Sequence, residues 1–349
     1  MTVPLVFGHR GMGCSIPGTL SIYPENSLTA FKAAKEIGVD GVELDVFLSK
    51  NGEILVIHGF RDVNSLCLTT LPRASGDGKR TFVMEDLVET MDVRASDLLL
   101  RKPWASLHGN EDTHKIMQKF RESKEASYVE YITNMDDADG ESVPTLEEVV
   151  ELLGDSVQYN IELKGMRQEL GLRVLECLEK HKNIKALISS FNWEPPELDE
   201  NSPYANVELE RFPNGKVKAD LLRPLVGNKL GVPLGLLFNA NDSQLPSINR
   251  IVQCAKSFNA AFVNVAHDFW SVPNQFLEQS QEEGTDVLEY FVIEMHRHDL
   301  KVLSYFFASG PDNEEDLKRH VNSPVDIICP NDVERTVKLV KDALNDRLP

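Results

Sequence analysis

Short apolar runs alternate with amphipathic helical stretches along most of the chain. Eight of these runs have the length and apolar character typical of buried strands. They cover residues 5–8, 42–46, 157–163, 186–191, 234–238, 262–265, 302–305 and 327–329. Strands that alternate with helices predict right-handed crossovers and a parallel sheet, and eight such units favour a closed barrel over an open, doubly wound sheet.

Capping residues mark several of the helices between these strands. Asn26 or Ser27 can cap a helix that ends at Gly38, and Thr145 with Glu148 forms a capping box for another. Further helices are predicted over 171–180, 251–258, 286–296 and 332–344. The fold class that follows is α/β, an eight-stranded parallel β/α (TIM) barrel.

The pattern degrades between residues 60 and 144. A segment of this length is too long for a simple loop in a compact domain. We therefore expect residues 60–144 to form an inserted subdomain or lid at the barrel mouth, partly helical over 85–90. The whole chain, residues 1–349, is expected to be a single barrel domain that carries this insertion.

A hairpin is predicted after the second strand. Apolar and acidic side chains alternate there, so Glu43 and Asp45 share one strand face. The Asn51-Gly52 dipeptide favours a two-residue type I′ turn. With that turn the paired positions sum to 103, which places Asp45 opposite His58. A solvated strand face could carry the same residues, so the rest of the chain must decide between the two interpretations.

The composition is that of an ordinary globular protein with a large acidic excess. The 349 residues include 36 Lys and Arg against 55 Asp and Glu, a formal net charge of −19. This charge argues against a nucleic-acid partner and against binding to an anionic membrane surface. An anionic substrate is still permitted, because a bound divalent cation can invert the local field.

Targeting and cysteine patterns indicate a cytoplasmic protein. The N-terminal residues lack a basic region followed by a long apolar run, and no stretch approaches the length of a membrane span. The five cysteines show no CxxC spacing, so the sequence suggests neither a zinc site nor a disulfide framework. The sequence does not indicate an oligomeric state.

Charged side chains and histidines gather at the predicted carboxyl ends of the strands, where barrels of this kind carry their chemistry. Carboxylates that crowd together repel one another unless a cation neutralises them, and Mg²⁺ or Ca²⁺ prefers oxygen ligands. We therefore expect three of these carboxylates to bind a divalent cation. The full set of residues is His9, Arg10, Glu43, Asp45, His58, Glu162 and Lys164, with Glu43, Asp45 and Glu162 as the metal ligands.

The other members of this set suit phosphate chemistry. His9 and His58 can act as general acid and base near neutral pH, and Arg10 and Lys164 can hold an anionic substrate. Together these residues predict metal-assisted phosphoryl transfer. Each has an ordinary explanation as well, since His9 alone could be a structural histidine and Glu162 with Lys164 a simple salt bridge.

A few other polar residues receive lesser roles. Asn26 fits a helix cap better than a site role. His267 and Asp268 could reach the barrel mouth, although we expect them to lie outside the site. We expect His108 and His114 to be surface residues, because a separation of six residues does not place them on one helical face.

An ordered set of motifs resembles the glycerophosphodiester phosphodiesterase family. The motifs are GHRG at 8–11, PENS at 24–27, ELDV at 43–46, NGEILVIHG at 51–59, NIELKG at 160–165, SSFN at 189–192 and VDIICPND at 325–332. The resemblance implies a distorted eight-stranded barrel that hydrolyses glycerophosphodiesters to glycerol 3-phosphate and an alcohol. It also implies attack by the 2-hydroxyl of the substrate itself, giving a cyclic phosphate that water then opens.

The chain departs from the family pattern in three places. Gly59 stands where the family usually has an aspartate after the second histidine. The stretch with Tyr305 lacks the tryptophan that the family often carries, so Tyr305 could form the aromatic wall instead. The segment after the hairpin is longer than the family minimum.

Two different functions therefore stay open beside this one. A phosphodiesterase that acts on lysophospholipids or sphingolipids would want an apolar barrel mouth, and Phe306 with Phe307 would allow one. A catalytically silent barrel that binds phosphodiesters would be consistent with Gly59.

Overall fold

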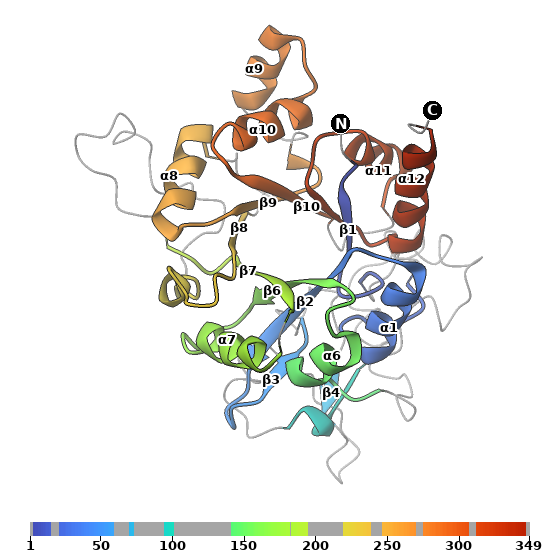
Figure 1. Cartoon of the computed structure of the whole chain (residues 1–349), viewed down its shortest axis with the longest axis vertical. Helices are drawn as coiled ribbons and strands as arrows, with labels where there is room; N and C mark the ends of the chain where they lie inside the picture. The colour runs from blue at the N-terminus through green and yellow to red at the C-terminus, as the bar shows by residue number, and fades with distance from the viewer. Residues whose placement is uncertain are drawn as a thin grey trace, which may run out of the picture.

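The centre of the molecule is a closed barrel of eight parallel strands, surrounded by helices (Figure 1). The computed structural model describes residues 3–14, 21–58, 70–72, 94–100, 141–181, 183–194, 219–238, 246–269, 275–306 and 312–346. The barrel strands are β1 (Leu5–Gly8), β2 (Gly41–Leu48), β6 (Gln158–Leu163), β7 (Lys185–Ser190), β8 (Leu234–Phe238), β9 (Phe262–Ala266), β10 (Lys301–Tyr305) and β11 (Ile327–Cys329). The barrel closes because β1 pairs with both β11 and β2. The predicted barrel and its eight strands are confirmed.

Alternating side chains along each strand build two separate layers. Val42, Leu44 and Val46 point outward and join the large apolar core that packs against the helices. The intervening Glu43 and Asp45 therefore point into the barrel. A second apolar cluster fills the interior below them and consists of Phe7, Leu187, Phe262, Leu303, Ile327 and Cys329.

The helices that surround the barrel are α1 (Leu28–Ile37), α6 (Leu146–Leu153), α7 (Leu170–Lys180), α8 (Ile248–Phe258), α9 (Gln275–Glu283), α10 (Val287–His296), α11 (Glu314–Val321) and α12 (Val333–Asn345). Ser27 caps α1, and Thr145 with Glu148 makes the predicted capping box of α6. The sequence did not reveal α9 and α11, because their charged segments lack a continuous apolar stripe. None of the described helices combines the length and the apolar character needed to cross a bilayer.

The hairpin after β2 forms, but its predicted register is wrong. β3 (Ile54–Val56) runs antiparallel to β2 with Val46 opposite Val56, so the paired positions sum to 102. Asp45 consequently lies opposite Ile57, whose N–H donates to the Asp45 carbonyl oxygen at 2.9 Å. His58 is not the cross-strand partner of Asp45, because it lies beyond the last paired residue of β3.

The error comes from the turn. Ser49 N donates to the Glu53 carbonyl oxygen at 2.9 Å, which leaves a loop of three residues instead of two. Gly52 adopts a positive φ of 91°, whereas Asn51 does not. A type I′ turn needs positive φ at both central positions, while a three-residue loop needs it at its last position only.

Part of the predicted insertion packs on this hairpin. β4 (Thr70–Pro72) and β5 (Leu98–Leu100) form a two-stranded antiparallel sheet. One apolar cluster joins the segment to the hairpin and contains Phe47, Leu55, Ile57, Ala95, Leu98, Leu100 and Val143. The predicted helix at 85–90, His108 and His114 lie outside the described residues.

Candidate active site

A tight turn at the end of β1 presents His9 and Arg10. Arg10 and Gly11 have left-handed backbone conformations, with φ of 49° and 91°. A Cβ atom on Gly8 would lie 1.9 Å from the carbonyl oxygen of Gly11, so the turn can close this tightly only with glycine at position 8. The turn directs Arg10 N to Glu43 Oε2 at 2.8 Å.

Three carboxylates from two neighbouring strands meet at the same end of the barrel. Glu43 and Asp45 come from β2 and Glu162 from β6, and one oxygen of each lies within 4.8 Å of the others. The pairing register explains this, because Asp45 and Glu162 are direct neighbours across the two strands. Lys164 follows β6 and places Nζ 3.2 Å from Asp45 Oδ1, and it forms a second ion pair with Glu162. The structure therefore brings the predicted carboxylates and cation together.

The charges at this end of the barrel do not balance. Arg10 donates from Nη1 to Glu25 Oε1 at 2.8 Å, and its Nε lies 3.2 Å from Asp45 Oδ2. Among the described residues, Arg10 and Lys164 are the lysine and arginine side chains that contact the group. Four buried carboxylates face them, namely Glu25, Glu43, Asp45 and Glu162. If all four are ionised, two negative charges remain in excess, which a divalent cation would neutralise.

The pKa values of the three carboxylates shift in different directions, because the nearby charges differ. Burial, together with the charges of Asp45 and Glu162, raises the pKa of Glu43 well above its ordinary value. Burial raises the pKa of Glu162 to about 7 even though Lys164 opposes the shift. Burial would raise the pKa of Asp45 as well, but Lys164 and Arg10 outweigh it and hold that pKa below its usual range.

The donor set fits a hard divalent cation. Glu43 Oε1 is buried without a hydrogen-bond partner, so one ligand oxygen is already desolvated. The three side chains offer carboxylate oxygens alone, the ligands that Mg²⁺ and Ca²⁺ prefer. Glu43, Asp45 and Glu162 could therefore hold such a cation.

A chain of buried polar groups orients His9. Its Nδ1 lies 3.0 Å from Asn331 Oδ1, while Asn331 Nδ2 donates to Asp312 Oδ1 at 3.0 Å. Because an ionised carboxylate only accepts hydrogen bonds, it fixes the orientation of the Asn331 amide, and the amide oxygen then requires the His9 proton on Nδ1. His9 Nε2 is left with its lone pair and lies 3.8 Å from Glu43 Oε2. Burial and Arg10 lower the pKa of His9 to about 3, so the ring is neutral near pH 7.

His58, which lies just after β3, is close to the same charged group. It follows the end of β3, and its Nδ1 is buried without a hydrogen-bond partner. Burial and the charge of Arg10 lower its pKa well below the ordinary value, while the charge of Asp45 opposes the shift. Asp45 in turn has its pKa lowered by His58, so the two side chains lie within electrostatic reach of each other.

The prediction that Asn26 serves mainly as a helix cap is wrong. Ser27 caps α1, and Asn26 has a left-handed φ of 56° that turns its side chain towards the site. Asn26 Nδ2 donates to Asp45 Oδ2 at 3.0 Å. Glu25, Asp312 and Asn331 had no predicted role, although the PENS and VDIICPND motifs contain the first and the last of them.

Residues of the SSFN motif donate hydrogen bonds to the backbone at the end of the strand that carries Glu162 and Lys164. Ser190 Oγ donates to the Leu163 carbonyl oxygen at 2.8 Å, and Asn192 Nδ2 donates to the Gly165 carbonyl oxygen at 2.9 Å. These two hydrogen bonds hold the backbone on either side of Lys164.

Aromatic side chains lie beside Lys164. Its Nζ is 5.5 Å from the centre of the Phe191 ring, and Tyr305 meets that ring edge-on at 5.9 Å. Burial and the charges of Glu162 and Asp268 raise the pKa of Tyr305 well above its ordinary value. The position of Tyr305 is thus consistent with the expected aromatic wall.

His267 and Asp268, which we expected to lie outside the site, follow β9 and lie next to Tyr305: His267 N donates to the Tyr305 carbonyl oxygen at 2.8 Å, and the charge of Asp268 reaches the Tyr305 hydroxyl. The ring of His267 stacks on Phe306 at 4.3 Å. Phe306 is fully buried, so it does not form the apolar mouth that a lysolipid substrate would want. Phe307, the second aromatic residue of that expected mouth, lies outside the described residues, and so does Gly59.

Relatives of known sequence match about half of the chain. A glycerophosphodiester phosphodiesterase of Caldanaerobacter subterraneus subsp. tengcongensis is 30% identical over 195 residues, which are 54% of this chain and 58% of the relative. Human glycerophosphocholine phosphodiesterase is 30% identical over 168 residues, which are 48% of this chain and 22% of the human protein. The matches therefore span between about a fifth and three fifths of these two relatives.

Solved structures share the fold over nearly the whole chain. Glycerophosphodiester phosphodiesterase from Thermotoga maritima has a TM-score of 0.51 at 22% identity, covering 97% of this chain and 99% of its own. An Oleispira antarctica phosphodiesterase in complex with the product sn-glycerol-3-phosphate has a TM-score of 0.54 at 17% identity, covering 98% and 97%.

The family profile covers the site residues that follow β1, β2 and β6. The profile of the glycerophosphoryl diester phosphodiesterase family matches residues 9–195, which begin at His9 and include the strand end with Glu162 and Lys164. More than half of the chain is matched in this way. The chain belongs to the glycerophosphoryl diester phosphodiesterase family.

Proposed function

We propose that the chain hydrolyses glycerophosphodiesters to glycerol 3-phosphate and an alcohol, with a divalent cation as cofactor. The observation that carries this proposal is the meeting of Glu43, Asp45 and Glu162 within 4.8 Å at the barrel end to which the β1 turn brings His9. Family membership supports it, and so does the solved phosphodiesterase whose complex contains sn-glycerol-3-phosphate.

In the proposed reaction the two histidines move protons. One accepts the proton of the substrate's 2-hydroxyl as that oxygen bonds to phosphorus. The other takes up a proton beside the bound phosphate anion and gives it to the departing alcohol oxygen. A cyclic phosphate results, and water opens it with the proton transfers reversed. The neutral ring of His9, with its Nε2 lone pair held in place by Asn331, supports a role in this exchange. The substrate's own hydroxyl gains from being held close to the phosphorus.

Arg10 and Lys164 are proposed to contact the substrate phosphate. The Lys164 side chain is 14% exposed and that of Arg10 6%, so Lys164 is the more accessible of the two. A cation held by Glu43, Asp45 and Glu162 would supply positive charge to the phosphoryl oxygens.

Substrate turnover with and without metal tests this function. The purified chain is incubated with glycerophosphocholine or lysophosphatidylcholine in the presence of Mg²⁺, Ca²⁺ or a chelator, and the products are quantified. We expect glycerol 3-phosphate from glycerophosphocholine only when a divalent cation is present. A panel of head groups would then define the alcohol.

Different products would indicate different functions. Release of choline from lysophosphatidylcholine alone would indicate a lysophospholipase D activity. Saturable binding without turnover in any metal would indicate a silent phosphodiester-binding barrel. Equal turnover with metal and with chelator would contradict the role given to the three carboxylates.

A further inference from the structure

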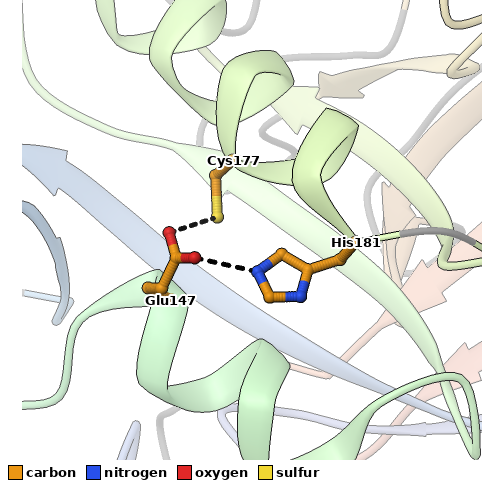
Figure 2. A group of neighbouring side chains, drawn as sticks. All are labelled: Glu147, Cys177 and His181. Atoms are coloured by element: carbon orange, nitrogen blue, oxygen red, sulfur yellow. Dashed lines mark hydrogen bonds and ion pairs between the residues drawn. The ribbon is translucent and has the colours of Figure 1, made fainter.

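A second group of metal-ligating side chains lies on the outside of the barrel. Figure 2 shows Glu147 from the first turn of α6 facing Cys177 and His181 at the end of α7. Glu147 Oε1 is 2.9 Å from His181 Nε2, and Glu147 Oε2 is 3.6 Å from Cys177 Sγ. One ligand atom from each residue lies within 4.8 Å of the others. Across the described residues, only this group and the carboxylates at the strand ends converge so closely.

The chemistry of this group differs from that of the strand-end carboxylates. It offers one sulfur, one nitrogen and one carboxylate, the donor types that Zn²⁺ takes in proteins. Zinc bonds of about 2.0–2.3 Å in tetrahedral geometry separate neighbouring ligand atoms by roughly 3.3–3.7 Å. The structure holds one ligand atom of each residue within 4.8 Å of the others, so side-chain rotations could bring the three to these separations.

The exposure of the group also suits a bound ion. Cys177 is buried, whereas the side chains of His181 and Glu147 are 23% and 38% exposed. An ion could therefore enter from solvent and keep a water molecule as its fourth ligand. α6 and α7 lie side by side outside the barrel (Figure 1). An ion bound by residues of both helices would restrict the motion of one helix relative to the other.

We propose that Glu147, Cys177 and His181 form a Zn²⁺ site that ties α6 to α7. The CxxC pattern could not reveal it, because the ligands come from two helices and only Cys177 and His181 are close in sequence. Binding requires the thiol to lose its proton to solvent as sulfur bonds to the metal. Because a thiol is mostly protonated near pH 7, uptake of the ion releases a proton and strengthens as pH rises.

Lys180 competes with the metal for Glu147. Its Nζ lies 3.1 Å from Glu147 Oε2, and its side chain is 64% exposed. Such an exposed lysine can turn away into water at little cost, because exposed ion pairs contribute at most about 1 kcal/mol. Lys180→Gln is therefore expected to strengthen zinc binding by up to roughly fivefold.

Metal titrations of the full-length chain test the proposal. The protein is stripped with a chelator, which is then removed, and Co²⁺ is titrated as a spectroscopic stand-in for Zn²⁺. We expect a near-ultraviolet charge-transfer band, which requires a cysteine thiolate ligand, and we expect Zn²⁺ to abolish it by displacing Co²⁺. The melting temperature should rise with Zn²⁺.

Matched variants identify the ligands. Cys177→Ser should remove the band and weaken zinc binding by at least about a hundredfold, since even the loss of an outer partner costs 10- to 100-fold. His296→Gln is the control, because His296 pairs with Asp326 at 2.8 Å on the surface just as His181 pairs with Glu147. Glu162→Gln should leave the band intact, which separates this site from the strand-end carboxylates.

Two outcomes would overturn the proposal. If no charge-transfer band forms, Glu147, Cys177 and His181 are only a hydrogen-bonded contact between two helices. If the band persists in Cys177→Ser, another thiol binds the metal. Because these readouts do not depend on phosphodiester hydrolysis, their failure would leave the proposed activity untouched.

Discussion

The two clusters that could hold a metal ion differ in burial and in donor chemistry. Glu43, Asp45 and Glu162 are buried and offer oxygen alone, whereas Cys177 and His181 add sulfur and nitrogen to a partly exposed carboxylate. The buried group sits on strands whose register fixes each side chain. The partly exposed group sits on two neighbouring helices, whose relative position is set by side-chain packing.

The comparison teaches how burial governs the surrounding charges. Inside the barrel, Lys164 contacts two carboxylates and Arg10 contacts two, because an uncompensated buried charge is costly. On the surface, Lys180 contacts Glu147 in water, where the same kind of pair contributes little. In the absence of metal, substitutions in the inner group should therefore lower the free energy of unfolding much more than substitutions in the outer group.

The largest expected effect is on catalysis at the inner group. His9→Ala and His58→Ala should each reduce kcat for glycerophosphocholine by roughly 10²–10⁴-fold, as expected for the loss of a general acid or base. His181→Ala, at the outer group, should leave kcat within about twofold. Steady-state kinetics at saturating metal would measure all three. A near-normal rate in either of the first two variants would contradict the acid–base assignment.

The next effect compares two lysines that both contact carboxylates. Lys164→Met should lower the free energy of unfolding by about 3–5 kcal/mol in chelator, because it leaves Asp45 and Glu162 buried without that cation. Lys180→Met should lower it by less than about 1 kcal/mol. Urea unfolding followed by tryptophan fluorescence would measure both. Equal losses would show that burial does not separate the two groups, and recovery of Lys164→Met on adding Mg²⁺ would support the inner metal site.

The sequence predicted the inner group better than the outer one. The strand ends could be found because each buried strand is a continuous apolar run, and the side chains after it share one end of the barrel. The identity of Glu43, Asp45, Glu162 and Lys164 followed from that rule. The register of the hairpin did not, because one extra loop residue shifts every cross-strand pair without changing the apolar pattern.

The sequence did not predict several contacts between side chains that are far apart along the chain. Asn331 lies 322 positions from His9, and Glu147 lies 30 and 34 positions from Cys177 and His181. No local periodicity reports such contacts, since they arise when the barrel closes and when two helices pack. Asn26 was misjudged for a related reason, because its left-handed backbone is visible only in three dimensions.

A buried histidine away from both groups tests the role of burial by itself. His320 is fully buried, with Nε2 2.9 Å from Ser304 Oγ, and burial lowers its pKa to about 3. In the unfolded chain the pKa of a histidine is about 6.5, so protons bind the unfolded state preferentially between pH 6.5 and 3. The contribution of this residue to stability is thus complete above pH 6.5 and is lost as the pH falls towards 3.

The expected size of this effect is about 2–3 kcal/mol between pH 6.5 and pH 4.5. Urea unfolding at the two pH values would measure it for the natural chain and for His320→Gln, which should show a correspondingly shallower loss. His296→Gln, at a surface position, is the matched control for replacing a histidine by glutamine. An unchanged slope in His320→Gln would mean that His320 is not held neutral by burial.

A smaller effect is expected from the residue that orients His9. Asn331→Leu removes the acceptor for His9 Nδ1 and should reduce kcat by roughly tenfold, the equivalent of one hydrogen bond. It should also shift the pH profile of kcat, because the ring is no longer held in one tautomer. Asn331→Asp, which keeps an acceptor oxygen, should recover part of the rate. A loss of stability with an unchanged pH profile would indicate a structural role alone.

The smallest effect concerns the outer group in the absence of metal. Glu147→Gln removes the charge that His181 and Lys180 contact, and the hydrogen bond from His181 is the main cause of the lowered pKa of Glu147. Because the carboxylate is partly exposed, we expect the free energy of unfolding in chelator to fall by less than about 1 kcal/mol. With excess Zn²⁺ the difference between Glu147→Gln and the natural chain should widen, since only the natural chain then keeps all three ligands. Urea unfolding under both conditions would decide the point, and a difference that stays the same with and without Zn²⁺ would reduce the outer group to an ordinary surface contact.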